Sequence, residues 1–206
     1  HESPQIAIDT GGNPTLRRNR IHDAKSNGVR VTDNGLGILE DNDIYGHESP
    51  QIAIDAGGNP TLRRNRIHDG KGNGVRVFDN GLGIFEDNDI FGHELPQASI
   101  DVGGNPTLRR NRIHDGNDCG VYIYNNGLGI FEDNEIFGHV LSQVIVHSGG
   151  NPTLRRNRIH DGKSFGISID NGHGTFEEND LRNNKKGAWD ISGKSKSYIQ
   201  RIKNIE

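Results

Sequence analysis

Residues 57–70 read GGNPTLRRNRIHDG, and this stretch decides the fold because it returns almost unchanged along the chain. Copies start at Gly11, Gly57, Gly103 and Gly149, so the period is 46 residues. A period of about 20–50 residues is typical of stacked supersecondary units, each of which needs its neighbours to bury its apolar face. The repeat therefore predicts a solenoid.

Each copy contains a weaker repeat of half that length. The segment Leu16–Ile21 (LRRNRI) is answered 23 residues later by Leu39–Ile44 (LEDNDI). The structural unit is thus a coil of 23 residues that alternates between a basic and an acidic version.

Apolar residues fall into columns when the chain is written in this register. Runs such as Val29–Val31 and Ile52–Ile54 alternate with a period of two, and Gly or Asn-Gly stands at the corners. This pattern indicates short strands, and no segment keeps the helical period over two turns. We predict an all-β fold, a right-handed parallel β-helix of about nine coils.

Composition by itself points elsewhere. The chain is 30% hydrophobic with a mean hydropathy of −0.77 and 29 glycines, a profile that leans towards disorder. The apolar residues nevertheless concentrate on the inward columns, which favours one elongated domain. We assign residues 1–192 to the β-helix and residues 193–206 to a tail that caps its open end.

Other classes of protein are disfavoured. No apolar run is long enough for a membrane span or a signal-peptide core, so we expect no membrane partner. Cys119 is the single cysteine, which rules out an intramolecular disulfide and a CxxC metal site. The sequence opens at His1 part-way through a repeat and contains no Met, which favours a piece of a longer protein.

One polar column consists of asparagine. Stacked amides can donate and accept along the axis of a solenoid, so we predict a structural ladder rather than catalytic residues. Its members are Asn19, Asn42, Asn65, Asn88, Asn111, Asn134, Asn157 and Asn179.

Three further columns are charged, and each alternates in sign. Arg64, for example, stands between Asp41 and Asp87, so neighbouring coils present opposite charges. The recurring RRNR motif would suggest nucleic-acid binding, but the interleaved acids cancel it and the net charge is −4. We expect no nucleic-acid partner.

Four His-Asp pairs are the obvious candidates for metal chemistry: His22-Asp23, His68-Asp69, His114-Asp115 and His160-Asp161. Equivalent histidines lie two coils apart, about 9.6 Å on the spacing of strands. A metal–nitrogen bond is only about 2.1 Å, so two of them cannot share an ion. We predict stacking between aromatic rings, with no metal and no cofactor.

Departures from repetition mark the candidate binding site. Phe78, Tyr122, Tyr124, Ile145 and His147 are expected to cluster on one flank of the middle coils. Grouped exposed aromatics favour contact with a protein or a sugar, whereas the alternative is ordinary cross-strand packing. We predict no catalytic residue, because β-helix enzymes that cleave uronate polymers use converging carboxylates and here every acid has arginine neighbours.

The sequence also resembles a known group of repeats. Residues 59–92, NPTLRRNRIHDGKGNGVRVFDNGLGIFEDNDIFG, are similar to the carbohydrate-binding-and-sugar-hydrolase (CASH) repeats of pectin-lyase-like right-handed β-helices. Within that group they resemble the β-helix region of the F-box-only-protein-eleven family, substrate receptors of cullin-type ubiquitin ligases. The resemblance covers residues 1 to about 184 and implies the fold and, more weakly, a protein-binding role.

Two functions follow from these observations. The first is a non-catalytic module for protein–protein interaction, as in substrate recognition by an F-box-type ligase, which implies a cytoplasmic or nuclear location. The alternative is a carbohydrate-active β-helix that binds, lyses or hydrolyses a polysaccharide, which fits a secreted microbial protein. A release of unsaturated or reducing ends from a uronate polymer would discriminate between them.

Overall fold

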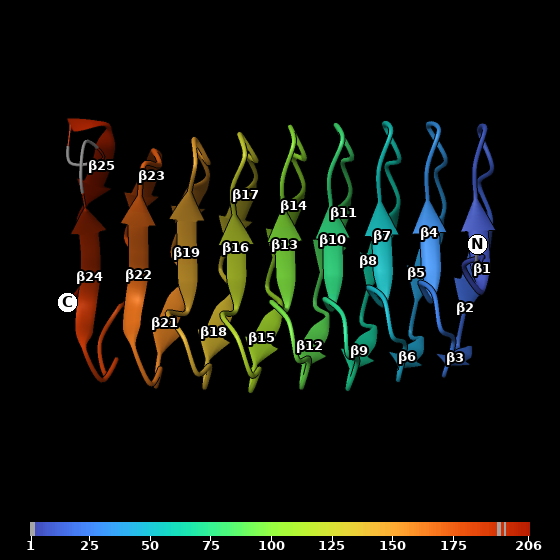
Figure 1. Ribbon diagram of the computed structural model, residues 1–206, viewed down its shortest axis with the longest axis horizontal. Helices are drawn as coiled ribbons and strands as arrows, with labels where there is room; N and C mark the ends of the chain where they lie inside the picture. Colours follow the sequence, from blue (N-terminus) through green and yellow to red (C-terminus); the bar gives the residue numbers. More distant parts are fainter. Residues whose placement is uncertain (1–2, 193–194, 196) are drawn as a thin grey trace.

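The computed structural model describes residues 3–192, 195 and 197–206 and consists of short β-strands arranged in three parallel sheets. Sheet A runs along one face of the molecule from the N-terminal to the C-terminal end (Figure 1). Its strands are β1 (Ile6–Ile8), β4 (Val29–Val31), β7 (Ile52–Ile54), β10 (Val75–Val77), β13 (Ala98–Ile100), β16 (Val121–Ile123), β19 (Val144–His147), β22 (Phe165–Asp170) and β24 (Gly187–Ser192).

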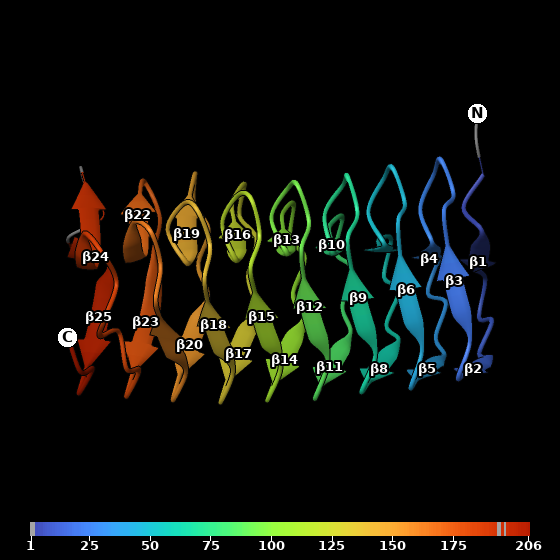
Figure 2. The same cartoon turned by 90° about the horizontal axis from the view of Figure 1, so that it is seen from below.

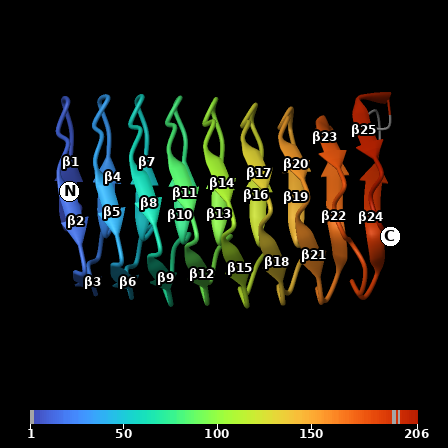
Figure 3. The same ribbon diagram turned by 180° about the vertical axis from the view of Figure 1, so that it is seen from behind.

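Sheets B and C complete each coil and are visible from below and from behind (Figures 2 and 3). The strands of sheet B are β2 (Thr15–Arg17), β5 (Ile38–Glu40), β8 (Thr61–Arg63), β11 (Ile84–Glu86), β14 (Thr107–Arg109), β17 (Ile130–Glu132), β20 (Thr153–Arg155), β23 (Gly174–Glu177) and β25 (Ile199–Ile202). Those of sheet C are β3 (Arg20–His22), β6 (Asp43–Tyr45), β9 (Arg66–His68), β12 (Asp89–Phe91), β15 (Arg112–His114), β18 (Glu135–Phe137) and β21 (Arg158–His160).

The strand register confirms the predicted parallel β-helix. Strand β10 pairs with β13 so that Val75 lies opposite Ala98, 23 residues along the chain. The offset falls to 22 residues between β20 and β23, where Leu154 lies opposite Phe176. The nine described strands of sheet A are thus joined by eight full turns of chain.

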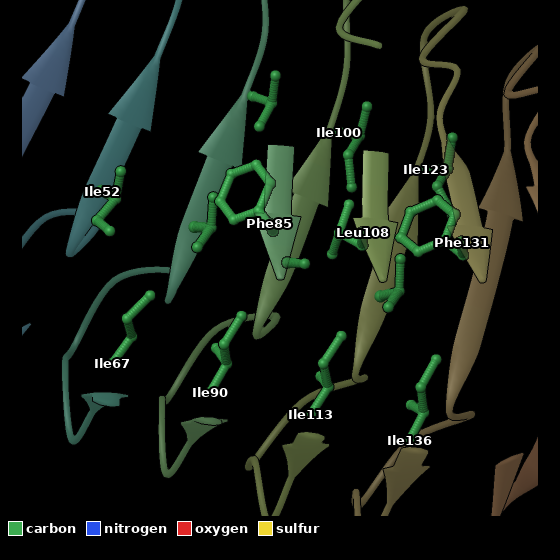
Figure 4. Packing of buried hydrophobic residues seen from close by; sticks show 14 of the residues in the cluster. Ile52, Ile67, Phe85, Ile90, Ile100, Leu108, Ile113, Ile123, Phe131 and Ile136 are labelled. Carbon is green, nitrogen blue, oxygen red and sulfur yellow. The ribbon is translucent and has the colours of Figure 1, made fainter. Parts of the chain in front are cut away.

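The interior is apolar and continuous. Inward side chains of the three sheets meet along the axis, as Figure 4 shows for Phe85, Phe131 and the isoleucines around them. Phe85, Ile90 and Phe131 are fully buried, and each such side chain contributes about 1.5–3 kcal/mol to folding. A modest apolar content therefore suffices, because the inward positions of every coil are filled by buried apolar side chains.

The corner between sheets B and C carries the asparagine ladder. The side-chain amide of Asn65 donates to Asn88 Oδ1 at 3.0 Å and to the Leu39 carbonyl oxygen at 2.8 Å. The backbone N–H of Asn65 donates to the same Asn88 oxygen at 3.0 Å. The same pattern joins the asparagine column from Asn19 to Asn179. Each side-chain amide thus provides hydrogen-bond partners for backbone groups that have no backbone partner at the bend.

The middle charged column occupies a left-handed backbone position at this corner. Arg64 has φ 51° and Asp87 has φ 57°, values that L-residues other than glycine adopt at a cost of about 1–2 kcal/mol. The charges pair across coils as predicted, since Arg64 Nε lies 2.8 Å from Asp41 Oδ1 and Arg110 Nε lies 2.9 Å from Asp87 Oδ1. The corner thus combines backbone strain with compensating polar contacts.

The predicted tail continues the solenoid in its later part. Residues 193, 194 and 196 lie outside the described residues. Strand β25 pairs with β23, and Asn204 accepts from the Asn179 side chain at 3.0 Å, so it adds a further rung to the ladder. Whether the tail also covers the end of the helix stays a prediction. The described residues contain no helix long and apolar enough to cross a membrane.

Candidate functional site

A groove on the outer face of sheet A contains most of the predicted binding residues. It has a volume of about 510 Å³ and lies over β13, β16 and β19. The groove, called here the tyrosine groove, is lined by Asn73, Arg76, Leu95, Pro96, Ser99, Asp118, Cys119, Tyr122, Tyr124, Leu141, Ile145 and His147. Four of the five residues predicted from sequence are therefore brought together there.

Two stacked tyrosines form the centre of the tyrosine groove. Tyr122 and Tyr124 are two residues apart on an extended segment, so both project outward. Their rings stack with centroids 4.4 Å apart and an interplanar angle of 14°. Burial raises the pKa of both hydroxyls, and the nearby Asp101 carboxylate adds to the rise at Tyr124. The pair is half-buried rather than exposed as predicted, and the loops that precede β13, β16 and β19 line one flank of the groove with Leu95, Asp118 and Leu141.

Phe78 lies in a smaller neighbouring groove. This phenylalanine groove has a volume of about 280 Å³ and includes Arg30, Ala53, Asp55 and Arg76. The Arg76 guanidinium stacks over the Phe78 ring, 4.4 Å from its centroid. The predicted patch is thus divided between two adjacent hollows that share Arg76.

The two grooves are copies of one another within the 46-residue repeat. Arg30, Ala53 and Phe78 of the phenylalanine groove correspond to Arg76, Ser99 and Tyr124 of the tyrosine groove, each pair separated by 46 positions. Equivalent points therefore lie two strands apart along sheet A, about 9.6 Å on the strand spacing. The tyrosine groove is the larger copy and carries two aromatic rings.

An ion pair with a buried carboxylate supports each groove, and the sequence analysis did not predict it. Arg30 Nε donates to Asp55 Oδ2 at 2.9 Å, and Arg76 Nη2 donates to Asp101 Oδ2 at 3.0 Å. Asp55 and Asp101 are only 2% and 1% exposed, although they occupy an outward column. The shared spacing of 25 residues between arginine and aspartate was the available signal.

His147 closes one end of the tyrosine groove. Its Nε2 lies 3.6 Å from Asp170 Oδ2, and its Nδ1 lies 2.8 Å from the Ser148 hydroxyl. Ile145 is half-buried on the adjacent outward position of β19. These contacts place a polar group and an apolar side chain at the same end of the groove.

The His-Asp pairs lie on the outer face of sheet C, away from the tyrosine groove. His68 stacks on Tyr45 and Phe91 with centroid distances of 5.1 and 5.0 Å, in agreement with the predicted aromatic column. Its Nδ1 contacts Asp69 at 2.8 Å and its Nε2 contacts Asp43 at 3.0 Å. The described residues contain no cluster of three or more His, Cys, Asp or Glu side chains that could hold a metal ion.

A second histidine column was missed in the sequence. His47, His93 and His139 are fully buried, and each Nδ1 contacts the side-chain oxygen of a glutamine four residues later. Burial lowers the pKa of His93 and of His139 to about 4. The pattern H-x-x-x-Q at a spacing of 46 residues was the signal. These side chains fill a corner and do not reach the tyrosine groove.

Comparison with known proteins assigns the fold family. Residues 1–104 and 83–202 match the family described as the right handed beta helix region. The chain belongs to the right-handed β-helix family. This result supports the predicted handedness and the pectin-lyase-like fold, whereas the F-box resemblance finds no support in it. No curated protein sequence matches the chain.

Solved structures with similar folds include enzymes that act on alginate. The chain is 15% identical to the mannuronan C-5 epimerase AlgE6 A-module of Azotobacter vinelandii, with a TM-score of 0.73 over 98% of this chain and 63% of that one. The AlgE4 A-module of the same organism gives 13% identity and a TM-score of 0.67, covering 91% and 57% of the two chains.

A variant of the periplasmic alginate epimerase AlgG is 16% identical, with a TM-score of 0.58 over 96% of this chain and 61% of that one. The chain therefore spans about three fifths of the length of these structures. At such identities the likeness shows the fold alone.

Proposed function

We propose that the chain is a carbohydrate-binding β-helix that holds a linear polysaccharide along the outer face of sheet A. The observation that carries the proposal is the stacked Tyr122–Tyr124 pair in the larger of two repeat-related grooves. A stacked aromatic surface offers apolar area for the face of a sugar ring, and the polar groups beside it can bind hydroxyls.

The arrangement of the grooves favours a polymer over a single sugar. Two equivalent hollows repeat along one face, so a ligand with a repeating structure can occupy both. Arg76 lines both grooves, so the two hollows are adjacent along the sheet. The structures with a similar fold include a mannuronan C-5 epimerase and an alginate epimerase, which supports the choice of a polysaccharide as the ligand class.

The proposed role is binding without turnover. The charged residues of sheets B and C are paired with opposite charges, as Arg109 and Arg155 are with Glu132 at 2.9 and 2.6 Å. The tyrosine groove contributes Asp118 and His147 but no converging carboxylate pair of the kind that cleaves glycosidic bonds. We therefore expect binding of oligosaccharides and no unsaturated or reducing ends.

The test is calorimetric titration with oligomannuronate, oligogalacturonate and cello-oligosaccharides. At least one series should bind with an affinity that rises with chain length, and Tyr122→Ala should weaken it about tenfold, since an aromatic anchor often contributes more than about 1 kcal/mol. Ile84→Ala, on the exposed face of sheet B, is the matched control and should bind normally. Equal binding by both variants would place the ligand elsewhere.

Protein binding is the second candidate, as the F-box resemblance implies. Leu95 and Leu141 stand 46% and 45% exposed at the rim of the tyrosine groove, and such side chains suit a protein interface. This function would be favoured over the first if the chain bound none of the glycans but bound a purified protein. Leu141→Ser should then weaken the binding of that protein.

A further inference from the structure

Asp55 and Asp101 occupy the same position in successive 46-residue repeats, yet their hydrogen bonding differs. Both oxygens of Asp55 are used, because Arg30 Nη2 donates to Oδ1 at 3.2 Å and the Thr32 hydroxyl donates to the same oxygen. Asp101 receives both of its hydrogen bonds from Arg76 on Oδ2, at 3.3 and 3.0 Å. Asp101 Oδ1 is buried and accepts no hydrogen bond among the described residues, although the Tyr124 hydroxyl lies close enough to this carboxylate for it to raise the pKa of the tyrosine.

The difference traces to one position in the repeat. Thr32 corresponds to Phe78, 46 residues later, so the hydroxyl that completes the Asp55 site is replaced by an aromatic ring. Asp101 consequently lies between Phe78 and Tyr124 in one outward column of sheet A. The chain thus contains one completed and one uncompleted version of the same carboxylate site.

An unpartnered carboxylate oxygen in the interior is costly. A buried charged acceptor without a donor destabilises the fold, so a donor that reaches it is strongly favoured. Asp101 is 1% exposed, and its neighbours Arg76, Ser99 and Tyr124 all line the tyrosine groove. Asp101 itself lies beneath these residues, so a donor from the groove has to enter between Ser99 and Tyr124 and displace the tyrosine ring to meet the free oxygen.

We propose that a hydroxyl of the bound glycan donates to Asp101 Oδ1 and takes the place that the Thr32 hydroxyl takes beside Asp55. This inference rests on the proposed function and names the recognised group, a free sugar hydroxyl. A ligand carboxylate is excluded from this point, because it would face the Asp101 carboxylate without a donor. The carboxylates of a uronate chain would have to point away from the groove floor, towards solvent.

The site also explains why the two grooves are not equivalent in binding. In the phenylalanine groove the hydroxyl of Thr32 already satisfies Asp55, so that groove offers apolar contact from Phe78 and no free acceptor. Beneath the tyrosine groove the Asp101 acceptor is free, and the stacked Tyr122 and Tyr124 rings line the groove above it. The tyrosine groove is therefore the specificity-determining one, and the phenylalanine groove extends the contact along the polymer.

A matched pair of variants at Phe78 tests the proposal. Phe78→Thr restores the hydroxyl found beside Asp55, whereas Phe78→Val has the same shape without it. We expect Phe78→Thr to melt at a higher temperature than Phe78→Val and to bind the glycan about tenfold more weakly than Phe78→Val, because its own hydroxyl occupies Asp101. Equal glycan affinity of the two variants would overturn the proposal.

Two controls separate this inference from the proposed function. Thr32→Val removes one of the two donors to Asp55 Oδ1 and should lower the melting temperature, whereas Asp101 keeps its free oxygen and the affinity for the glycan should not fall. If the wild-type chain binds a glycan but the two Phe78 variants bind it alike, only the Asp101 inference fails. If the wild-type chain binds none of the oligosaccharides, the proposed function fails and this inference with it.

Discussion

Individual asparagines hold the corners of the solenoid, and Asn88 shows how much each contributes. Its amide donates to the Leu62 carbonyl oxygen and to Asn111 Oδ1, while its own oxygen accepts from the backbone and side chain of Asn65. Replacement of Asn88 by alanine removes all of these hydrogen bonds together and leaves the buried groups of its neighbours with fewer partners.

We therefore expect Asn88→Ala to lower the free energy of unfolding by about 2–4 kcal/mol in urea titrations. Asn19→Ala is the control, since Asn19 stands at the exposed end of the ladder and accepts no bond from a preceding rung. It should cost clearly less. Equal losses at the two positions would mean that the ladder is not cooperative along the axis.

Buried histidines make stability depend on pH. Burial lowers the pKa of His93 from its ordinary value of 6.5 to about 4. Between pH 6.5 and 4 the unfolded chain takes up a proton at this position and the folded chain does not, so the free energy of unfolding falls as pH falls.

The expected slope from His93 is about 1.4 kcal/mol per pH unit. His93→Gln keeps a neutral polar side chain but cannot take up this proton. Between pH 6.5 and 4, the free energy of unfolding of this variant should therefore depend less steeply on pH, by the amount that the uptake of one proton contributes. Urea titrations at a series of pH values measure it. An unchanged slope would show that His93 becomes protonated in the folded chain.

At the scale of the elements, charge alternation aligns neighbouring strands and corners. Arg64 donates to Asp41 Oδ1 at 2.8 Å and also contacts Glu40, whereas Asp87 lies on the following coil in the same column. Opposite neighbours favour this register, because a shift of one coil would bring like charges together.

Arg64→Glu should therefore lower the melting temperature, since the new acid stands between Asp41 and Asp87. Adding Asp41→Arg and Asp87→Arg restores alternation locally and should recover part of the loss. Thermal unfolding followed by circular dichroism compares the three chains. A triple variant that melts no higher than the single one would contradict the observed register.

The strands could be read from the sequence because their signal is repeated in every coil. Columns such as Leu62, Phe85 and Leu108 fix both the inward face and the 23-residue register, and the structure reproduces them. The chain direction within each sheet follows, since strands one coil apart must run parallel.

The grooves could be read only in part. The aromatic residues stood out as departures from repetition, but half-burial of Tyr122 depends on loops around Leu95, Asp118 and Leu141 whose height no periodicity encodes. The Arg76–Asp101 pair joins neighbouring strands. Both side chains occupy outward positions of the two-residue strand pattern, which predicts that they are exposed, yet Asp101 is buried. The burial of the three histidines was not predicted, because polar side chains are seldom found in a protein interior.

At the scale of the whole molecule, a uniform rod carries one non-uniform face. Sheets B and C repeat paired charges and stacked rings, whereas the outer face of sheet A has the two grooves and the uncompleted Asp101 site. Binding of an extended ligand along this face is the central claim.

The most direct test of that claim is to map amide chemical shifts in the ¹⁵N-labelled chain during titration with the oligosaccharides. The predicted result is a continuous band of perturbed residues on β10, β13, β16 and β19, centred on Tyr122 and Tyr124, with sheets B and C unaffected. Perturbations confined to sheets B or C, or none with any oligosaccharide, would contradict it.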